Sequence, residues 1–210
     1  MDKIPPLLSE VLRPKKLADL NLPSDTIESL ERMAAKGSIM NLLFYGKPGI
    51  GKTSAARILT DLIDADVYPV DAAGGKSDAV IREGIKLFSG TVSMFDDPKV
   101  CFIDEADFLP KATILALRNI IETASGSTRF IFTANDIDKF DEPLKSRLHP
   151  ICFDVARRDV DRVVDRMVDR YYRILTEMGW SLDLDRLRAI VGAYFPDLRS
   201  IANKLQFEFG

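Results

Sequence analysis

A glycine-rich segment carries the clearest chemistry in this sequence. Residues 46–53 read GKPGIGKT and fit the pattern G-x-x-x-x-G-K-[ST], between an apolar segment and a helix-forming one. Glycines let such a loop curl so that its backbone N–H groups point at phosphate oxygens, and the N-terminus of the next helix adds positive potential. Lys52 is expected to reach the outer phosphates, and the Thr53 hydroxyl to bind Mg²⁺. The loop therefore predicts a site for ATP or ADP with Mg²⁺, formed by Gly46, Lys47, Pro48, Gly49, Ile50, Gly51, Lys52, Thr53 and Ser54.

Two adjacent carboxylates follow an apolar segment about 50 residues further along the chain. Residues 100–107 read VCFIDEAD. Because adjacent residues at the end of a strand point in different directions, Asp104 can face a metal ion while Glu105 faces an attacking water molecule. Mg²⁺ is usually bound through a carboxylate together with phosphates. We expect Asp104 to bind Mg²⁺ with Thr53, and Glu105 to be the base or water-orienting group in hydrolysis.

Two other polar residues accompany later apolar segments. Asn135 ends the segment FIFTAN, where its amide could orient water or a phosphate oxygen, although an Asn-Asp pair also commonly starts a turn. Arg147 precedes the last of the strand-like segments. A lone arginine is most commonly a surface cation, so the residues alone leave both assignments open.

Strand-like and helix-like segments alternate along the first three quarters of the chain. Apolar segments of strand length are expected at 42–45, 66–70, 100–103, 129–133 and 151–155, with helical patterns at 55–63, 78–88 and 113–123. This alternation predicts an α/β fold, a parallel sheet covered by helices on both faces. The ends of its parallel strands lie side by side, where ligands bind, so the polar residues above should meet there.

The pattern becomes purely helical after Val155. A long apolar repeat of helical period is expected to end at Gly179, followed by shorter helices near 185–194 and 198–207. We predict an α/β domain over residues 1–156 and a three-helix domain over 157–210. The long helix carries one stripe of arginines and one of aspartates, expected either as a solvated face with weak ion pairs or as a docking surface for another subunit. These stripes consist of Arg158, Arg162, Arg166 and Arg170, and of Asp161, Asp165 and Asp169.

Composition limits the class of protein further. The 210 residues include 29 basic and 32 acidic side chains, a net charge of −3. Proteins that coat nucleic acid by themselves are usually basic, so any contact with DNA is expected to be local. The apolar segments are too short to cross a membrane and the N-terminus does not resemble a signal peptide, which predicts a cytoplasmic protein. Cys101 and Cys152 are expected to be free, buried thiols.

The order of these motifs resembles the AAA+ ATPases, and most closely the clamp-loader ATPase subunits, namely the replication factor C small subunits and their T-even phage equivalents. The resemblance covers nearly all of residues 11–207. It includes the segments LRP at 12–14, NLP at 21–23, AKG at 35–37, SRL at 146–148 and FPDLR at 195–199. Leu12 stands where the family usually has tyrosine and Leu148 where it has cysteine, and neither side chain takes part in chemistry.

Roles for individual residues follow from this resemblance. It implies a P-loop NTPase domain of the AAA+ type with a three-layer parallel sheet, followed by a small three-helix lid. Arg13 and Pro14 would lie near the nucleotide base, and Asn135 would be the first sensor. Arg147 would reach the ATP of a neighbouring subunit, and Arg199 would be the second sensor.

The resemblance also implies partners. They are a sliding clamp, other clamp-loader subunits and primer–template DNA, in the cytoplasm of a prokaryotic cell or a phage-infected host. DNA would meet the starts of two helices near Lys76, Arg82 and Lys111 through sequence-independent phosphate contacts, an ordinary surface cation being the alternative at each. The family's helical collar domain does not follow Gly210, which implies either a truncated or a naturally collarless form.

The sequence thus predicts an ATPase that loads a sliding clamp on primer–template DNA and turns over weakly as an isolated chain. Water would attack the γ-phosphate in line, with Lys52, Glu105, Asn135 and a neighbour's Arg147 as the catalytic residues. Two alternatives are another replication ATPase, such as a helicase loader or initiator, and an ATP-binding structural subunit with little turnover. The sequence shows no helix-turn-helix or other added DNA-binding domain, which argues against an initiator. The DEAD string also suggests an RNA helicase, but 210 residues leave no room for a second motor domain.

Overall fold

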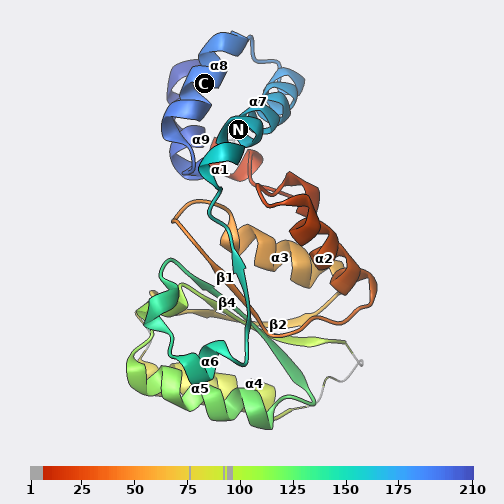
Figure 1. The fold of residues 1–210 in the computed structure, drawn as a ribbon, viewed down its shortest axis with the longest axis vertical. Helices are drawn as coiled ribbons and strands as arrows, with labels where there is room; N and C mark the ends of the chain where they lie inside the picture. The colour runs from red at the N-terminus through yellow and green to blue at the C-terminus, as the bar shows by residue number, and fades with distance from the viewer. Residues whose placement is uncertain (1–6, 76, 92, 94–96) are drawn as a thin grey trace, which may run out of the picture.

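The fold places a five-stranded parallel sheet beneath a unit of three helices (Figure 1). The computed structural model describes residues 7–75, 77–91, 93 and 97–210. The strand order is β2-β3-β4-β1-β5, so β1 lies inside the sheet beside β4 and β5. The strands are β1 (Leu42–Tyr45), β2 (Asp66–Asp71), β3 (Lys99–Asp104), β4 (Thr128–Ala134) and β5 (His149–Cys152).

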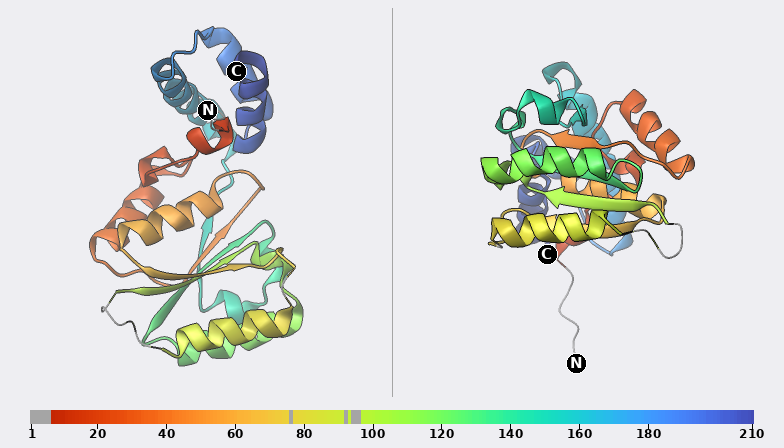
Figure 2. Two further views of the ribbon diagram at one scale, coloured as in Figure 1. Left: turned by 180° about the vertical axis from the view of Figure 1, so that it is seen from behind. Right: turned by 90° about the horizontal axis from the view of Figure 1, so that it is seen from below.

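Helices cover both faces of the sheet (Figures 1 and 2). One face packs its apolar side chains against α2 (Ser24–Ala35) and α3 (Lys52–Leu62). The other packs against α4 (Asp78–Ser89), α5 (Lys111–Thr123) and the short α6 (Glu142–Lys145). The central strands β3 and β4 are buried almost throughout, as expected for strands covered on both sides. The predicted three-layer α/β sheet is therefore confirmed.

Two details of the α/β unit differ from the prediction. The last strand lies at His149–Cys152 rather than at 151–155, because the His149 N–H bonds to the carbonyl of Asn41 and so fixes the pairing with β1. Helix α2 was not predicted. Only Leu30 is fully buried in it, while Ile27 and Met33 are partly buried, although its apolar residues recur with helical period as clearly as those of α3 and α5.

The two cysteines also differ from each other. Cys101 on β3 is buried and its thiol pKa is raised by that burial. Cys152 is exposed, so the expectation of a buried thiol there was wrong. The reason is the position of β5 at the edge of the sheet, where only Ile151 of the strand is buried.

The three-helix unit has its own apolar core. It consists of α7 (Val160–Glu177), α8 (Leu184–Tyr194) and α9 (Leu198–Phe209). Aspartates cap two of these helices, since Asp183 accepts from backbone N–H groups of α8, and Asp197 from those of α9. Leu8 of the short helix α1 (Leu8–Val11) and the following Leu12 belong to the same core. Residues 8–12 thus pack on the three-helix unit, and the division at 156/157 remains a proposal.

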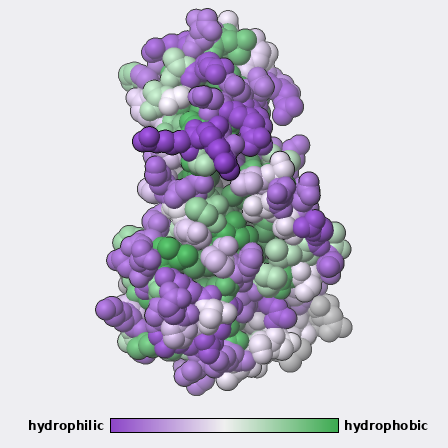
Figure 3. Space-filling view, in the orientation of Figure 1, coloured by the Kyte–Doolittle hydropathy of each residue, from purple (hydrophilic) through white to green (hydrophobic). Residues whose placement is uncertain are grey.

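The arginine stripe of α7 is only partly solvated. Polar side chains dominate the surface of the three-helix unit in Figure 3. Arg158 is 88% exposed, but it lies in the 3₁₀ turn Arg157–Asp159 that precedes α7 and not in the helix itself. Arg170 is not part of that surface, because its side chain is 14% exposed and faces the segment that follows α1. The expectation of a solvated stripe was therefore wrong at this residue. No helix among the described residues combines the length and the apolar character that crossing a bilayer requires.

Candidate functional site

A cavity of about 300 Å³ lies between the strand ends and the three-helix unit. This volume is within the usual range for small-molecule sites. Most residues predicted from the sequence to bind the nucleotide or to take part in catalysis line it, whereas Gly46, Lys47 and Arg147 do not. The predicted residues in the cavity wall are Arg13, Pro14, Pro48, Gly49, Ile50, Gly51, Lys52, Thr53, Ser54, Asp104, Glu105, Asn135 and Arg199.

The glycine-rich loop connects β1 to α3 in a conformation that needs glycine. Gly49 and Gly51 have positive φ angles of 75° and 105°. A Cβ on Gly49 would lie 2.3 Å from Oδ1 of Asp197, because the loop packs closely on the start of α9. The Leu198 N–H also donates to the Gly49 carbonyl at 3.1 Å. The loop is thus held by both units, and its backbone faces the cavity.

The side chain of Lys52, the first residue of α3, reaches back to the backbone of this loop. Its Nζ donates to the carbonyls of Gly46 at 2.7 Å and Lys47 at 2.8 Å, and to Oδ1 of Asn135 at 3.0 Å. Burial lowers the pKa of Lys52, and nearby carboxylates, Asp107 foremost, oppose that shift. The structure therefore brings Lys52 and Asn135 together with a desolvated ammonium group suited to phosphate oxygens.

The hydroxyl of Thr53 and the carboxylate of Asp104 are in direct contact. Thr53 Oγ1 donates to Asp104 Oδ1 at 2.9 Å, although the two residues lie on α3 and β3. Hydroxyl and carboxylate oxygens are ligands that suit Mg²⁺, which takes its other ligands from phosphates and water. In the described part of the chain, no cluster of three or more His, Cys, Asp or Glu could hold a metal alone. The donor set therefore fits Mg²⁺ bound together with a nucleotide.

Glu105 borders the cavity with an unusual backbone conformation. Its φ is 54° and its ψ 40°, in the left-handed region that non-glycine residues rarely adopt. Its N–H donates to Oγ1 of Thr133 at 2.9 Å. Strained conformations of this kind are concentrated at functional sites, and here the backbone sets the direction of the Glu105 side chain.

Several cavity residues escaped the sequence analysis. Thr133 lies two residues before Asn135, and residues i and i+2 of a strand share a face. This spacing could have predicted Thr133 as a site residue. Arg57 lies one helical turn after Thr53 and could have been found in the same way. Ala134 and Leu198 adjoin predicted residues, whereas others come from segments that no local pattern links to the loop. They include Ser9, Glu10, Tyr171 and Asn203.

Arg13 and Arg199 border the cavity from opposite ends of the chain. Arg13 follows α1, and its Nη2 lies 2.7 Å from Oε1 of Glu10. Arg199 is at the start of α9, where its N–H donates to Asp197 at 3.0 Å. The cavity is therefore flanked by cations that the three-helix unit and the chain start supply.

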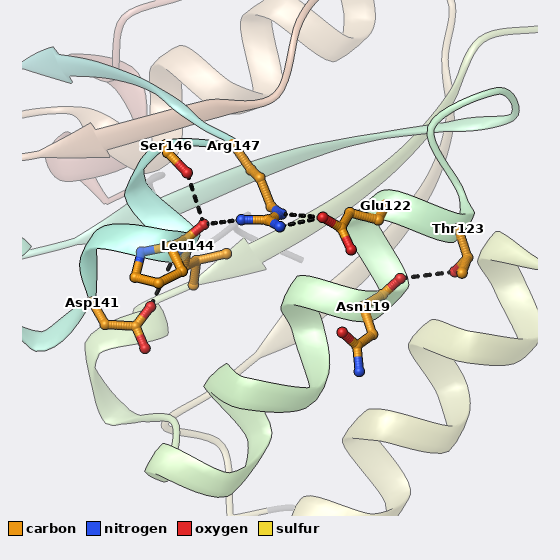
Figure 4. Close-up of polar contacts among 8 residues, drawn as sticks. Asn119, Glu122, Thr123, Asp141, Leu144, Ser146 and Arg147 are labelled. Carbon is orange, nitrogen blue, oxygen red and sulfur yellow. Dashed lines mark hydrogen bonds and ion pairs between the residues drawn. The ribbon is translucent and has the colours of Figure 1, made fainter.

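Arg147 is not one of the residues that line the cavity. Figure 4 shows its guanidinium directed at Glu122 of α5. Arg147 follows α6, and its guanidinium donates to the carbonyl of Pro143 and to Oε1 of Glu122 on α5, with an Nε–Oε1 distance of 3.0 Å. The structure thus brings Arg147 to Glu122 and not to Lys52 of its own chain.

Two of the three cations predicted to contact DNA lie on neighbouring helices. Arg82 is in the first half of α4, and Lys111 is the exposed first residue of α5, which packs against α4. Lys76 lies outside the described residues. The two described cations thus occupy one side of the α/β unit.

Comparison with known proteins completes the description of the site. A model of the ATPase family associated with various cellular activities (AAA) matches residues 42–153. The chain is 31% identical to the sliding-clamp-loader large subunit of Escherichia phage RB69, over 95% of this chain and 63% of that one. It is 32% identical to a replication factor C small subunit of Saccharolobus solfataricus, over 95% of this chain and 61% of that one. The chain thus spans less than two thirds of these relatives' length.

Solved structures give the same picture of the fold. The RuvB Holliday junction branch migration motor of Thermotoga maritima superposes with a TM-score of 0.66 over 94% of this chain and 66% of its own. The two sequences are 17% identical. At that level the likeness concerns the fold alone.

Proposed function

Because the chain belongs to the AAA family of ATPases, we propose that it is a clamp-loader ATPase subunit. It would couple ATP binding and hydrolysis to the loading of a sliding clamp on primer–template DNA. The observation that carries this proposal is similarity over 95% of the chain, through both units, to proteins named as clamp-loader or replication factor C subunits. The contacts within the site support ATP as the ligand.

ATP would bind with its phosphates on the glycine-rich loop. In the free chain, Lys52 donates to two loop carbonyls and to Asn135. Charged phosphate oxygens would take the place of these acceptors when ATP binds. Arg13 and Pro14 would border the base, and Arg199 would reach the phosphates from α9. Since the cavity wall draws on both units, bound nucleotide would hold the three-helix unit against the sheet.

Thr53 and Asp104 would hold Mg²⁺, which supplies charge that neutralises phosphate oxygens. Glu105 would orient the attacking water and accept its proton, and Asn135 would fix the water or a γ-phosphate oxygen. Lys52 would stabilise negative charge on the phosphate oxygens. Catalysis of this kind consists chiefly of positioning and electrostatic stabilisation.

Arg147 would complete the site of a neighbouring subunit. Within its own chain it is bonded to Glu122 and does not border the cavity, which supports a role in trans. Arginine fingers typically contribute about 10³–10⁵ in rate. An isolated chain would therefore hydrolyse ATP slowly, and assembly with other subunits would accelerate it.

A second candidate is another AAA motor that acts on DNA. The fold is shared with a branch migration motor, but at 17% identity that likeness does not bear on activity. A third candidate, an ATP-binding structural subunit, would have the same site without turnover. The 31–32% identity to the clamp-loader relatives favours the first candidate over both.

The proposal can be tested with ATP turnover in the presence of different partners. The purified chain would be assayed with sliding clamps of phage RB69 and Saccharolobus solfataricus, with primer–template DNA and with a four-way junction. We expect the clamp and primer–template DNA together to stimulate turnover, and the mass of the complex in ATP to include clamp. Glu105→Gln is the control, because its amide keeps the shape but accepts no proton, so it should bind ATP without turnover. Stimulation by the junction alone would contradict the proposal.

A further inference from the structure

We propose that Thr133 is a positioning residue that holds Asp104 and Glu105 in the arrangement that metal binding and hydrolysis require. This inference rests on the proposed ATPase function. Thr133 is not one of the residues with a predicted role. Its side chain is 1% exposed at the end of β4, and it borders the cavity.

The position of Thr133 follows from the register of the sheet. Strands β3 and β4 are parallel, and Ile103 pairs with Phe132. The next residues along, Asp104 and Thr133, therefore lie side by side, on the face of the sheet that α3 covers. This is the face from which Thr53 reaches Asp104.

The hydroxyl of Thr133 connects both acidic residues. It donates its single proton to Oδ1 of Asp104, and it accepts a hydrogen bond from the N–H of Glu105 at 2.9 Å. Oδ1 of Asp104 also accepts from Thr53 at 2.9 Å. Two hydroxyl groups from different elements therefore converge on the same carboxylate oxygen and fix the rotation of that carboxylate.

The bond to Glu105 has a separate consequence. Glu105 has a positive φ of 54°, which costs free energy for a residue with a Cβ. The N–H that Thr133 accepts belongs to this residue, so the hydroxyl stabilises the conformation that directs the Glu105 side chain. Neither neighbour can be displaced without breaking a bond to Thr133.

Removal of this hydroxyl would weaken Mg²⁺ binding and the positioning of the attacking water, but would leave phosphate binding by the glycine-rich loop unchanged. Thr133→Val keeps the volume and the branched shape of the side chain, so we expect the sheet to fold. The Glu105 N–H then lacks its acceptor and Asp104 lacks one of two donors. A lost hydrogen bond to a charged group, or a misplacement of about 1 Å, lowers rate or affinity by about 10- to 100-fold.

The chain contains a matched control in the same strand. Thr128 is the first residue of β4, is also 1% exposed, and lies five residues from Thr133, about 16 Å at the rise of a strand. Thr128→Val therefore makes the same substitution at the same burial, away from the cavity. Thr133→Ser is the rescue variant, because it keeps the hydroxyl and loses only a methyl group.

The experiment measures binding as well as turnover. The affinity for a fluorescent N-methylanthraniloyl-ATP is determined in EDTA and in Mg²⁺ for the wild type and the three variants, with melting temperature as a check of folding. For Thr133→Val we expect unchanged nucleotide affinity in EDTA. The increase in affinity that Mg²⁺ produces, and the rate of single-turnover hydrolysis, should each be about 10-fold or more lower than in the wild type. Thr133→Ser and Thr128→Val should resemble the wild type.

Three outcomes separate the possibilities. If Thr133→Val resembles Thr128→Val in both readouts, the positioning role is wrong. If Thr133→Ser is impaired as much as Thr133→Val, packing of the methyl group is responsible and the hydroxyl is not. If the wild type binds nucleotide in a Mg²⁺-dependent manner but never hydrolyses it, the proposed ATPase function fails, while the binding readout still decides the role of Thr133.

Discussion

Arg147 and Glu122 form an ion pair within one chain, with Nε of the arginine 3.0 Å from Oε1 of the glutamate (Figure 4). The two side chains are 30% and 55% exposed, so water screens the pair. Exposed pairs of this kind contribute about 0–1 kcal/mol. The contact can therefore hold Arg147 in the free chain and yield to a phosphate of a neighbouring subunit.

Mixing two inactive variants should restore hydrolysis if Arg147 acts in trans. Arg147→Ala keeps an intact cavity, and Lys52→Ala keeps an intact arginine. Because the lost finger contributes about 10³–10⁵ in rate, each variant alone should be nearly inactive. The mixture should hydrolyse ATP faster than either, in proportion to protein concentration. Full activity of Arg147→Ala by itself would show that the arginine has no such role.

Glu122→Gln should modestly accelerate hydrolysis in an assembled sample. The amide cannot form the ion pair, so Arg147 is free to enter a neighbouring site. Since the pair contributes no more than about 1 kcal/mol, the gain should be at most about fivefold. The measurement is turnover against protein concentration. Glu142→Gln, which alters an exposed residue paired with Lys145, is the control and should change nothing.

ATP affinity should fall as pH rises because of Lys52, and at a lower pH than an exposed lysine would cause. Burial lowers the pKa of this residue in the free protein, so its ammonium loses its proton at lower pH than an exposed lysine. Phosphate oxygens favour the charged form, and binding is therefore tightest below that pKa and weakens as pH rises through it. Titration of nucleotide binding against pH measures this effect. Lys52→Ala should bind about 10-fold or more weakly and without the same pH dependence.

The lowered pKa of Lys52 also makes the free energy of unfolding depend on pH. The folded chain holds the Lys52 proton less tightly than the unfolded chain does, so stability should rise with pH between the folded and unfolded pKa values. Lys52→Ala should lack this rise, which denaturant unfolding at several pH values would measure. Parallel curves for wild type and variant would contradict it.

Arg170→Ala should destabilise the protein and weaken nucleotide binding. Its guanidinium donates to the carbonyls of Leu12 and Arg13 at 3.0 and 3.1 Å, and lies 3.5 Å from the largely buried Asp19. Removing one partner of such a pair costs about 3 kcal/mol, and the segment that carries Arg13 would lose its support. The matched control is Arg166→Ala, one turn earlier on α7 and exposed, which should stay within about 0.5 kcal/mol. Denaturant unfolding and nucleotide affinity measure both effects.

Lys111 and Arg82 should contribute to DNA binding without sequence preference. Each phosphate contact that is lost lowers the slope of log affinity against log salt by about 0.7–0.9. The double variant Lys111→Ala with Arg82→Ala should therefore bind primer–template DNA more weakly and with a flatter salt dependence. Lys36→Ala, at the end of α2 on the other side of the sheet, is the control. An unchanged slope would mark both residues as ordinary surface cations.

The sheet, the helices α3, α4 and α5, and the phosphate loop could be predicted from the sequence alone. Strand and helix alternate with clear periods, and the loop pattern is local, because Lys52 and Thr53 follow directly from the glycines they depend on. Asp104 and Glu105 were also readable, since polar residues at the end of a buried strand must lie at the edge of the sheet. The helix α2 carries the same kind of periodic pattern and was missed although the sequence contained that signal.

Contacts between residues distant in sequence became known only from the packing of the elements. Thr133 became a partner of Asp104 and Glu105 through the pairing of β4 with β3, and sequence spacing does not specify that pairing. Arg170 is not solvated like the rest of the predicted stripe, because α7 lies against the segment after α1. Its guanidinium therefore donates to backbone carbonyls more than 150 residues away in sequence. A periodic pattern reports which face of an element is apolar, whereas the partner of a polar side chain depends on how the elements pack.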